Sequence, residues 1–317
     1  MPSYSGVWTL TAVFQAVGQG NWPVLLTGDI GLFGGGETSS PVNTIDYIAI
    51  ATTGNATDFG DLTQARRQLG ACSSSTLALF AGGVATGNTT VNTIDYVTIK
   101  VPSNATDFGD LTVARGYVTG CSSSTRGVFG GGVFSTTTYN VIDYVTIASA
   151  SNATDFGDLT TARYGTGSCS STTRGIFAGG LDADANTYNI IDYVTIASTG
   201  NATDFGDLLA SIGALAGCSS ATRGVFGGGN PATNVIQYVT IASTGNATDF
   251  GDLTISVFAL AACSSLTRGV FGGGIISSNT NVMEYVTIAS TGNATDFGDL
   301  TQARYGLAGC SNAHGGL

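Results

Sequence analysis

One octapeptide recurs six times along this chain without a substitution. Asn-Ala-Thr-Asp-Phe-Gly-Asp-Leu repeats at spacings of 49, 48, 49, 45 and 47 residues, with its phenylalanine at Phe59, Phe108, Phe156, Phe205, Phe250 and Phe297. A unit of this length cannot bury its apolar face alone, so a chain that repeats it builds a solenoid, a propeller or an array. The repeat therefore restricts the fold more than any other feature of the sequence.

Each unit holds four strand candidates. An apolar run enters glycines, as at Leu32 to Gly36, and an alternating segment follows, as at Ile142 to Ile147. The octapeptide comes next, and a small-residue segment ends at a cysteine, as at Tyr305 to Cys310. Four short strands within a repeat of this length are typical of a propeller blade. The sequence thus predicts an all-β chain in which residues 25–317 form a six-bladed β-propeller of four-stranded antiparallel blades.

The two ends of the repeat region complement each other. The first unit opens at its glycine-rich strand, whereas the last unit ends with the cysteine strand and Cys310 to Leu317. Pairing of the C-terminal strand with three N-terminal strands would complete a blade and leave no exposed sheet edge. The ring is therefore expected to close in a blade that both ends of the chain share.

Residues 1–24 lie outside the repeat. Apolar residues between positions 7 and 17 recur at helical spacing, which predicts a short amphipathic helix. Two interpretations stay open: the segment attaches the chain to a neighbouring subunit, or it packs on the chain's own core. In the first interpretation the attachment residues are Trp8, Phe14 and Trp22.

Charge and residue inventory argue against several functions. The net charge is −11, so the field of the chain would repel nucleic acid and anionic lipid. No apolar run approaches the ~18 residues of a membrane span, and the first residues lack the basic start of a signal peptide. With His314 as the only histidine and Glu37 and Glu284 as the only glutamates, we expect no enzyme, no cofactor and no metal site.

Cysteines, aspartates and asparagines keep fixed places in the repeat. Each unit has one cysteine thirteen residues after its phenylalanine, which we interpret as free and buried because equivalent strands lie too far apart for disulfides. The aspartate pairs, of which Asp58 and Asp61 are the first, are interpreted as turn makers, with Ca²⁺ binding as the alternative. The Asn-Ala-Thr sequons, the first at Asn55, are also interpreted as turns.

Arginines are periodic as well. Four units carry one six residues before the cysteine, at Arg66, Arg115, Arg163 and Arg304, whereas the other two have Ile212 and Val257. A second set lies in the turn before the glycine-rich strand, at Arg126, Arg174, Arg223 and Arg268. This regularity predicts arginine–aspartate pairs that tie blade to blade. A ring of arginines that captures an anionic sugar is the alternative.

The loops after the glycine-rich strands differ between units in length and content. In an up-and-down blade alternate connections share a face, so these loops gather on one face and the near-constant turns on the other. Repeat proteins commonly bind their partners through variable loops. The candidate binding residues are therefore Thr38, Ser39, Thr86, Asn88, Phe134, Tyr139, Asp182, Asp184, Tyr188, Asn230 and Asn279.

Two resemblances extend this interpretation. Glycines after an apolar strand, followed by Tyr144, Phe156 and Arg163, resemble the kelch repeat, whose fold is a β-propeller. The stretch from Gly6 to Pro23 ahead of glycine-rich repeats is similar to virion proteins of tailed bacteriophages. That second resemblance implies a tail-fibre, tail-tip or capsid-surface component.

The sequence hypothesis is a non-enzymatic virion protein that is made in the host cytoplasm and anchored by residues 1–24. Its partners would be other virion proteins and a host-surface glycan, and it would be assembled in multiple copies, with neither nucleic acid nor membrane insertion involved. The alternatives are a stand-alone carbohydrate-binding propeller and a capsid decoration protein. An enzymatic interpretation would require glycan turnover that depends on the aspartate pairs.

Overall fold

The computed structural model describes residues 25–317 of the chain. The helix expected at the N-terminus and the attachment residues Trp8, Phe14 and Trp22 lie outside these residues. From residue 25 onward the chain is all-β, with a single short 3-10 turn, η1 (Thr86–Asn88). Within this range no helix is long and apolar enough to cross a membrane.

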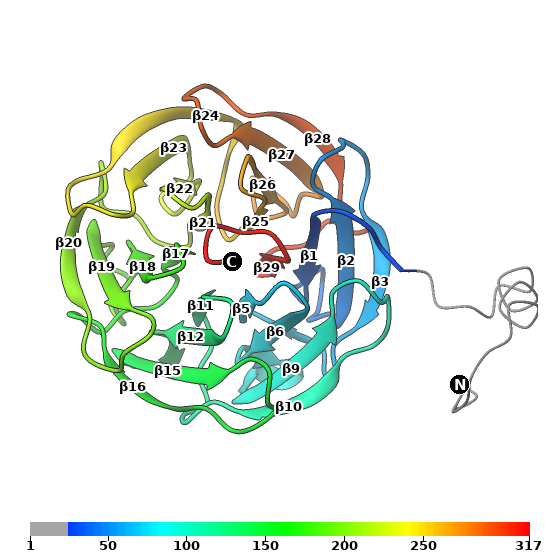
Figure 1. Ribbon diagram of the computed structural model, residues 1–317, viewed down its shortest axis with the longest axis horizontal. Helices are drawn as coiled ribbons and strands as arrows, with labels where there is room; N and C mark the ends of the chain where they lie inside the picture. The colour runs from blue at the N-terminus through cyan, green and yellow to red at the C-terminus, as the bar shows by residue number, and fades with distance from the viewer. Residues whose placement is uncertain (1–24) are drawn as a thin grey trace, which may run out of the picture.

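The described chain forms six four-stranded antiparallel sheets, which are set around a common centre in a propeller-like arrangement (Figure 1). The first sheet combines β1 (Ile30–Gly34), β2 (Thr44–Ala49) and β3 (Thr57–Asp61) with the last strand, β29 (Ala308–Ser311). The second consists of β5 (Gly70–Ser73), β6 (Leu77–Ala81), β9 (Thr93–Thr98) and β10 (Thr106–Asp110). The third consists of β11 (Thr119–Ser122), β12 (Arg126–Gly130), β15 (Val141–Thr146) and β16 (Thr154–Asp158).

The remaining sheets repeat this pattern from an inner strand at the centre to an outer strand at the rim. The fourth consists of β17 (Gly167–Ser170), β18 (Arg174–Ala178), β19 (Ile190–Thr195) and β20 (Thr203–Asp207). The fifth consists of β21 (Ala216–Ser219), β22 (Arg223–Gly227), β23 (Thr233–Thr240) and β24 (Thr248–Val257). The sixth consists of β25 (Ala261–Ser264), β26 (Arg268–Gly272), β27 (Val282–Thr287) and β28 (Thr295–Asp299).

The first sheet joins the two ends of the described chain. Strand β29 pairs antiparallel with β1, with Cys310 opposite Leu32 and Ser311 opposite Gly31. Each inner strand also lies against the inner strands of both neighbouring sheets, so the six form an unbroken circle. The predicted pairing of the C-terminal strand with three N-terminal strands is confirmed, and it gives β1 a partner on both of its edges.

The hydrophobic core lies between the sheets. Six clusters of buried residues occur, and each spans two neighbouring sheets. In one of them Phe108 of β10 and Leu79 of β6 pack with Phe129 of the next sheet. Within each sheet the repeat tyrosine meets the octapeptide phenylalanine edge-on, as Tyr144 and Phe156 do at 5.9 Å between ring centroids. A single unit could not bury this surface, which explains why the fold needs the whole set.

Contacts between neighbouring sheets explain the constancy of the octapeptide. Asn104 Oδ1 accepts a hydrogen bond from the backbone N–H of Asp61 in the preceding sheet, at 3.1 Å, and the same bond recurs at all six junctions. Gly109 has φ +146°, and a Cβ built there would lie 2.5 Å from the carbonyl oxygen of Ser151 in the next sheet. The turn prediction was wrong for the aspartates, because Asp58 and Asp61 lie in the outer strand β3.

The predicted arginine–aspartate pairs tie four of the six connections to the sheets that follow them. Arg115 and Asp143 have fully buried side chains, and Nη2 lies 3.0 Å from Oδ2. Burial lowers the pKa of the Arg115 guanidinium, and the charge of Asp143 partly offsets this effect. The aspartates come from the second strand of the repeat and not from the octapeptide. The other pairs are Arg66–Asp95, Arg163–Asp192 and Arg304–Asp46. Full burial removes this set from any anion-binding surface.

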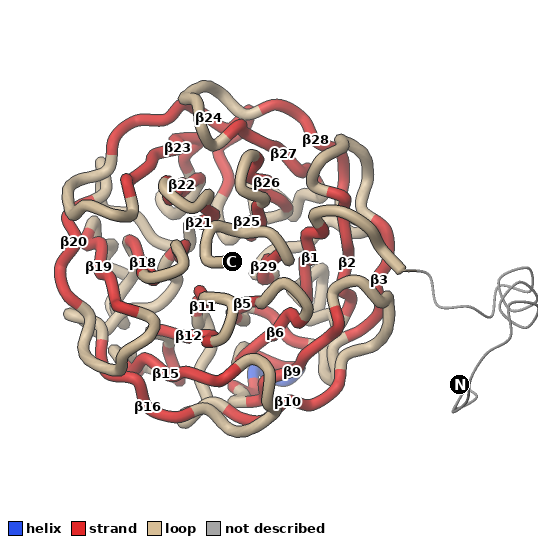
Figure 2. The backbone as a smooth tube through the Cα atoms, viewed as in Figure 1, coloured by secondary structure: helices blue, strands red, loops and turns tan. Residues whose placement is uncertain are grey.

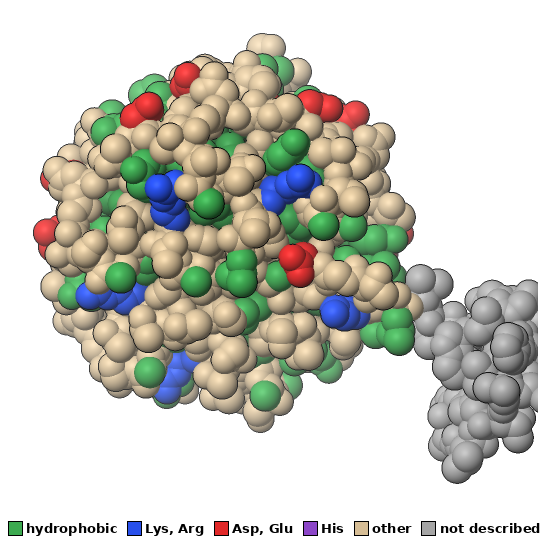
Figure 3. Space-filling view, turned by 45° about the horizontal axis from the view of Figure 1, so that its top comes forward, with side chains coloured by type: hydrophobic (Ala, Val, Ile, Leu, Met, Phe, Trp, Pro, Cys, Tyr) green, Lys and Arg blue, Asp and Glu red, His purple; other side chains and the backbone are tan. Residues whose placement is uncertain are grey.

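The second arginine set does not pair with aspartate, which corrects the prediction. The Arg126 guanidinium lies 4.4 Å from the ring centroid of Tyr144, and its Nη1 donates a 2.9 Å hydrogen bond to the carbonyl of Ile196 in the next sheet. A cation over an aromatic ring needs no counter-ion. Arg174, Arg223 and Arg268 repeat both contacts. Figure 3 shows basic groups set apart from one another on the face in view and not gathered into one patch.

Candidate functional site

The connections of the described chain lie on two faces. One face, here called the loop face, carries the loops after the glycine-rich strands and the connections that lead from one sheet to the next. The short strands β4 (Arg66–Arg67), β7 (Val84–Ala85) and β8 (Thr89–Thr90) pair across these segments. Figure 2 distinguishes the strands of the ring, in red, from the loops and turns that join them, in tan. Bridges such as Gly116 to Val133 do the same elsewhere on this face. The predicted grouping of variable loops is therefore confirmed.

A cavity of about 130 Å³ opens at the centre of the loop face, and we call it the mouth. Its wall consists of the last residues of each connection and the first residues of each inner strand. Most of these residues are glycine, alanine or leucine, which keeps the centre open. The side chains with polar groups in this wall are Gln68, Tyr117, Thr119, Thr166 and Ser168.

A closed ring of six backbone hydrogen bonds holds the mouth in shape. Each connection between sheets contributes one residue to this ring, two positions after its arginine position. The N–H of that residue donates to the carbonyl of the equivalent residue in a neighbouring connection, as Tyr117 does to Gln68 at 2.6 Å. All six residues have left-handed backbone conformations, with φ between 53° and 63°. The ring runs through Gln68, Tyr117, Gly165, Ala214, Ala259 and Gly306. Because the backbone alone makes this ring, its side chains are free to differ.

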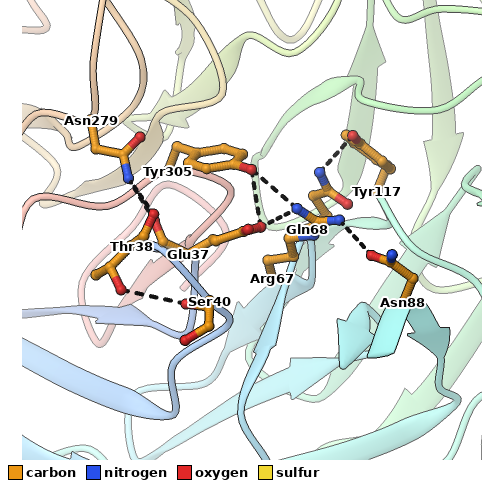
Figure 4. Close-up of polar contacts among 9 residues, drawn as sticks. All are labelled: Glu37, Thr38, Ser40, Arg67, Gln68, Asn88, Tyr117, Asn279 and Tyr305. Atoms are coloured by element: carbon orange, nitrogen blue, oxygen red, sulfur yellow. Dashed lines mark hydrogen bonds and ion pairs between the residues drawn. The ribbon is translucent and has the colours of Figure 1, made fainter. Parts of the chain in front are cut away.

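Beside the mouth, polar side chains from three sheets form one network (Figure 4). Arg67 forms an ion pair with Glu37 and donates hydrogen bonds to the hydroxyl of Tyr305 at 3.1 Å and to Asn88 Oδ1 at 3.0 Å. The Tyr305 hydroxyl donates to Glu37 Oε2 at 3.0 Å. Asn279 donates from Nδ2 to the backbone carbonyls of Glu37 and Thr38. The structure thus brings three predicted residues, Thr38, Asn88 and Asn279, to one place.

Two aromatic rings extend this side of the loop face. Gln68 Nε2 donates a 2.5 Å hydrogen bond to the hydroxyl of Tyr117, whose ring lies 5.0 Å from that of Tyr164. Burial raises the pKa of the Tyr117 hydroxyl, and Tyr164 adds to the shift. At neutral pH this hydroxyl is therefore protonated and is available both to donate and to accept hydrogen bonds.

The other predicted binding residues lie apart from this network. Asp182 accepts hydrogen bonds from its own loop, including one from the Tyr188 hydroxyl at 3.0 Å, and these bonds lower the pKa of Asp182. Phe134 is 47 % exposed at the tip of the hairpin formed by β13 (Val133–Phe134) and β14 (Thr137–Thr138). The rest are partly or fully exposed in separate loops: Ser39, Thr86, Tyr139, Asp184 and Asn230.

The six inner strands enclose a central channel, and the mouth is one end of it. The residues after β29 fill the opposite end. Figure 1 shows this segment crossing the centre of the ring. Six serines at the ends of the inner strands form a second closed ring, in which each Oγ donates to the carbonyl of the next serine, as Ser122 does to Ser73 at 2.7 Å. His314 lies beside it, with Nε2 3.2 Å from the Ser73 carbonyl. The mouth is thus the open end of the channel.

His314 is held as the neutral imidazole. Its Nε2 faces the Ser73 carbonyl, which only accepts, while Nδ1 accepts a 3.0 Å hydrogen bond from the N–H of Gly316. A proton on Nδ1 would face the N–H of Gly316, which is also a donor, so the charged imidazolium is disfavoured. Burial lowers the pKa of His314 to about 4, and the bond to Ser73 opposes the shift. The side chain therefore plugs the channel, and no nucleophile beside it is activated by a charged partner in the described structure.

The cysteines and aspartates offer no metal site among residues 25–317. All six cysteines are free and buried, as predicted. Burial raises the pKa of the Cys121 thiol to about 12, which keeps the thiol protonated. Five of the six sulfurs pack against a glycine of the neighbouring sheet, as Cys72 does at Gly127, where a Cβ would lie 2.5 Å from Sγ.

Comparison of the chain with models of protein families found no match, and a search of curated proteins found none either. The geometry of the loop face is therefore the ground on which a function is proposed. Sequence reasoning missed Arg67, Gln68, Tyr117 and Thr166, although a signal was present. The residues directly after the arginine position change from unit to unit within otherwise similar repeats.

Proposed function

We propose that the chain is a six-bladed β-propeller and a non-enzymatic structural component of a bacteriophage virion. It acts through its loop face, which either adsorbs to the host surface at a tail fibre or tail tip, or docks on a neighbouring virion subunit. Other virion proteins and a host-surface glycan are the partners. Residues 1–24 serve as the attachment segment, and the six-fold scaffold holds the loop face in a fixed geometry.

One observation carries the binding role. The repeats differ in the residues that line the mouth and form the loops, and they are alike in the residues that join neighbouring sheets. The junction bond of Asn104 and the serine ring are present in all units. By contrast, the two residues after the arginine position are Arg67 and Gln68 in one unit and Gly213 and Ala214 in another. Large and polar side chains in a single part of a symmetric ring are expected of a binding surface.

The arrangement of reactive groups supports a non-enzymatic role. Glu37 is paired with Arg67, and Glu284 is buried and hydrogen-bonded to Thr254. His314 faces backbone carbonyls and a serine hydroxyl inside the channel. General acid–base chemistry needs an accessible group whose pKa lies near the working pH, and these contacts oppose that role.

Virion assignment is tested by mass spectrometry of purified particles, followed by imaging to locate the chain. Stoichiometric copies at the tail would support adsorption, and copies on the head would favour the capsid decoration role. Absence from particles would overturn the virion assignment. The matched variant lacks residues 2–24: it should fail to enter particles while its unfolding midpoint stays that of the full chain.

A stand-alone carbohydrate-binding propeller is the second candidate. The shape and chemistry of the mouth favour it, because a cavity with both apolar and hydroxyl-bearing walls suits a sugar. Removal of residues 2–24 separates the two roles. A free lectin would keep its sugar affinity and its biological activity after this deletion, whereas a virion component would lose particle incorporation.

A further inference from the structure

The wall of the mouth has a polar half and an apolar half. Gln68, Tyr117 and Thr166 come from the connections that lead into the second, third and fourth sheets. The connections into the other three sheets contribute only small or apolar residues at these positions: Ala214, Leu215, Ala259, Leu260, Gly306 and Leu307. None of the described residues that line the mouth is charged. A ligand that fits should be uncharged, with one apolar face and one edge rich in hydroxyl groups.

Thr166 is the residue that packing alone does not explain. Its side chain is buried, at 6 % exposure, and Oγ1 has no hydrogen-bond partner among the described residues. The other five connections carry an aliphatic residue at this position: Leu69, Val118, Leu215, Leu260 and Leu307. A buried hydroxyl without a partner destabilises a fold. Oγ1 is sealed from solvent in this structure, so its presence where five repeats have aliphatic residues points to a contact that forms when the Thr166 side chain rotates toward an occupied mouth.

Tyr117 supplies a rigid aromatic wall. Its ring packs on Tyr164, and its hydroxyl is held by Gln68. Aromatic faces pack well against the C–H groups of a sugar ring, and a ring fixed in advance loses little entropy on binding. The polar edge of Tyr117 and the hydroxyls of Thr119 and Ser168 lie along the same half of the mouth.

We infer that the mouth binds a neutral saccharide, one ring of which packs on Tyr117 while its hydroxyls contact Gln68 and Thr166. The cavity of about 130 Å³ is smaller than the ~150 Å³ that accommodates one benzene ring, so it admits one side of a single sugar ring and leaves the rest of the sugar at the opening. The net charge of −11 selects against acidic sugars. This inference deepens the proposed function and rests on it for the loop face as the working surface.

Isothermal titration of the full chain with single sugars tests the inference. The panel holds neutral hexoses and N-acetylhexosamines, with glucuronic and sialic acids as acidic comparators. Tyr117→Ala introduces the residue that Ala214 and Ala259 already carry at this position, and Thr166→Val keeps the shape of the side chain. Leu266→Ala is the control, because Leu266 is an exposed apolar residue in the turn between β25 and β26, on the opposite face, and does not line the mouth.

A neutral sugar should bind the full chain. Tyr117→Ala and Thr166→Val should each raise Kd at least tenfold, while Leu266→Ala leaves it unchanged. Thr166→Val should also raise the melting temperature, since it removes an unpaired buried hydroxyl. Binding of no neutral sugar, tighter binding of an acidic sugar, or equal affinity of Thr166→Val and the parent chain would overturn the inference. If the chain is found on virions but binds no sugar, only the saccharide inference is overturned. If it binds sugar but is absent from virions, only the virion assignment is overturned.

Discussion

The buried pair Arg115–Asp143 can be replaced by a neutral pair that the chain already contains. At the matching positions leading into the fifth sheet stand Ile212, which is 6 % exposed, and Gln237, which is 4 % exposed. Gln237 Oε1 accepts a 2.8 Å hydrogen bond from the N–H of Leu209, as Asp143 accepts one from Thr112. The double variant Arg115→Ile with Asp143→Gln therefore gives the third sheet the same neutral pair that the fifth sheet already has.

The two single substitutions should differ in cost. Asp143→Gln leaves the Arg115 guanidinium buried without its anion, which should lower the free energy of unfolding by about 3–5 kcal/mol. Arg115→Ile leaves Asp143 with two hydrogen bonds from Thr112, the arrangement that Glu284 has opposite Val257, and should cost about 2 kcal/mol. The double variant should lie within about 1 kcal/mol of the parent chain, because neither charge remains.

A double-mutant cycle by urea unfolding measures this coupling. The four proteins are compared at pH 7, with circular dichroism as the probe and the slope of each transition as a check on cooperativity. The expected coupling free energy is about 4–6 kcal/mol, the sum of the single costs less that of the double variant. Additive single effects, or an Arg115→Ile cost equal to that of Asp143→Gln, would refute the reasoning.

Three further predictions follow from buried groups. Because the pKa of His314 is about 4 when folded and 6.5 when exposed, its contribution to stability is complete above pH 6.5. This contribution should fall by at most about 3 kcal/mol down to pH 4, and His314→Gln should lack the fall in urea titrations; an equal pH dependence would contradict the prediction. Val257→Arg with Glu284→Asp should raise the unfolding free energy by about 1–2 kcal/mol, and a lower denaturation midpoint would count against it. Since burial raises the pKa of Cys121 to about 12, a disulfide reagent should label the folded chain only as fast as it opens; rapid stoichiometric labelling would be inconsistent with the structure.

Much of the scaffold could be predicted because its causes are local and repeated. The four strands per unit, the free buried cysteines and the closing pair of β29 with β1 all follow from residue patterns within one period. The aspartate with which each arginine pairs was harder to predict. Arg115 could be expected to meet an aspartate, but the octapeptide offers two aspartates in every unit, whereas the position of Asp143 is aspartate in only four. Only the fold brings Asp143 within 3.0 Å of Arg115.

The candidate site was predicted only in part. Variable loops identified the face on which the mouth opens and included Asn88 and Asn279, which join the network around Arg67. The mouth itself escaped prediction, because Gln68, Tyr117 and Thr166 are about 49 residues apart in sequence. Nothing in one unit indicates that these three positions meet at the centre of a ring.

The sequence by itself determined the repeat and the strand pattern, since both depend on residue types and spacing along the chain. Tertiary structure decided which side chains share a cavity. Circular closure turns six equivalent positions into one wall, so the chemistry of the mouth is the sum of residues that are distant in sequence and differ between repeats. The left-handed backbone ring makes those differences tolerable, because its hydrogen bonds come from the main chain alone.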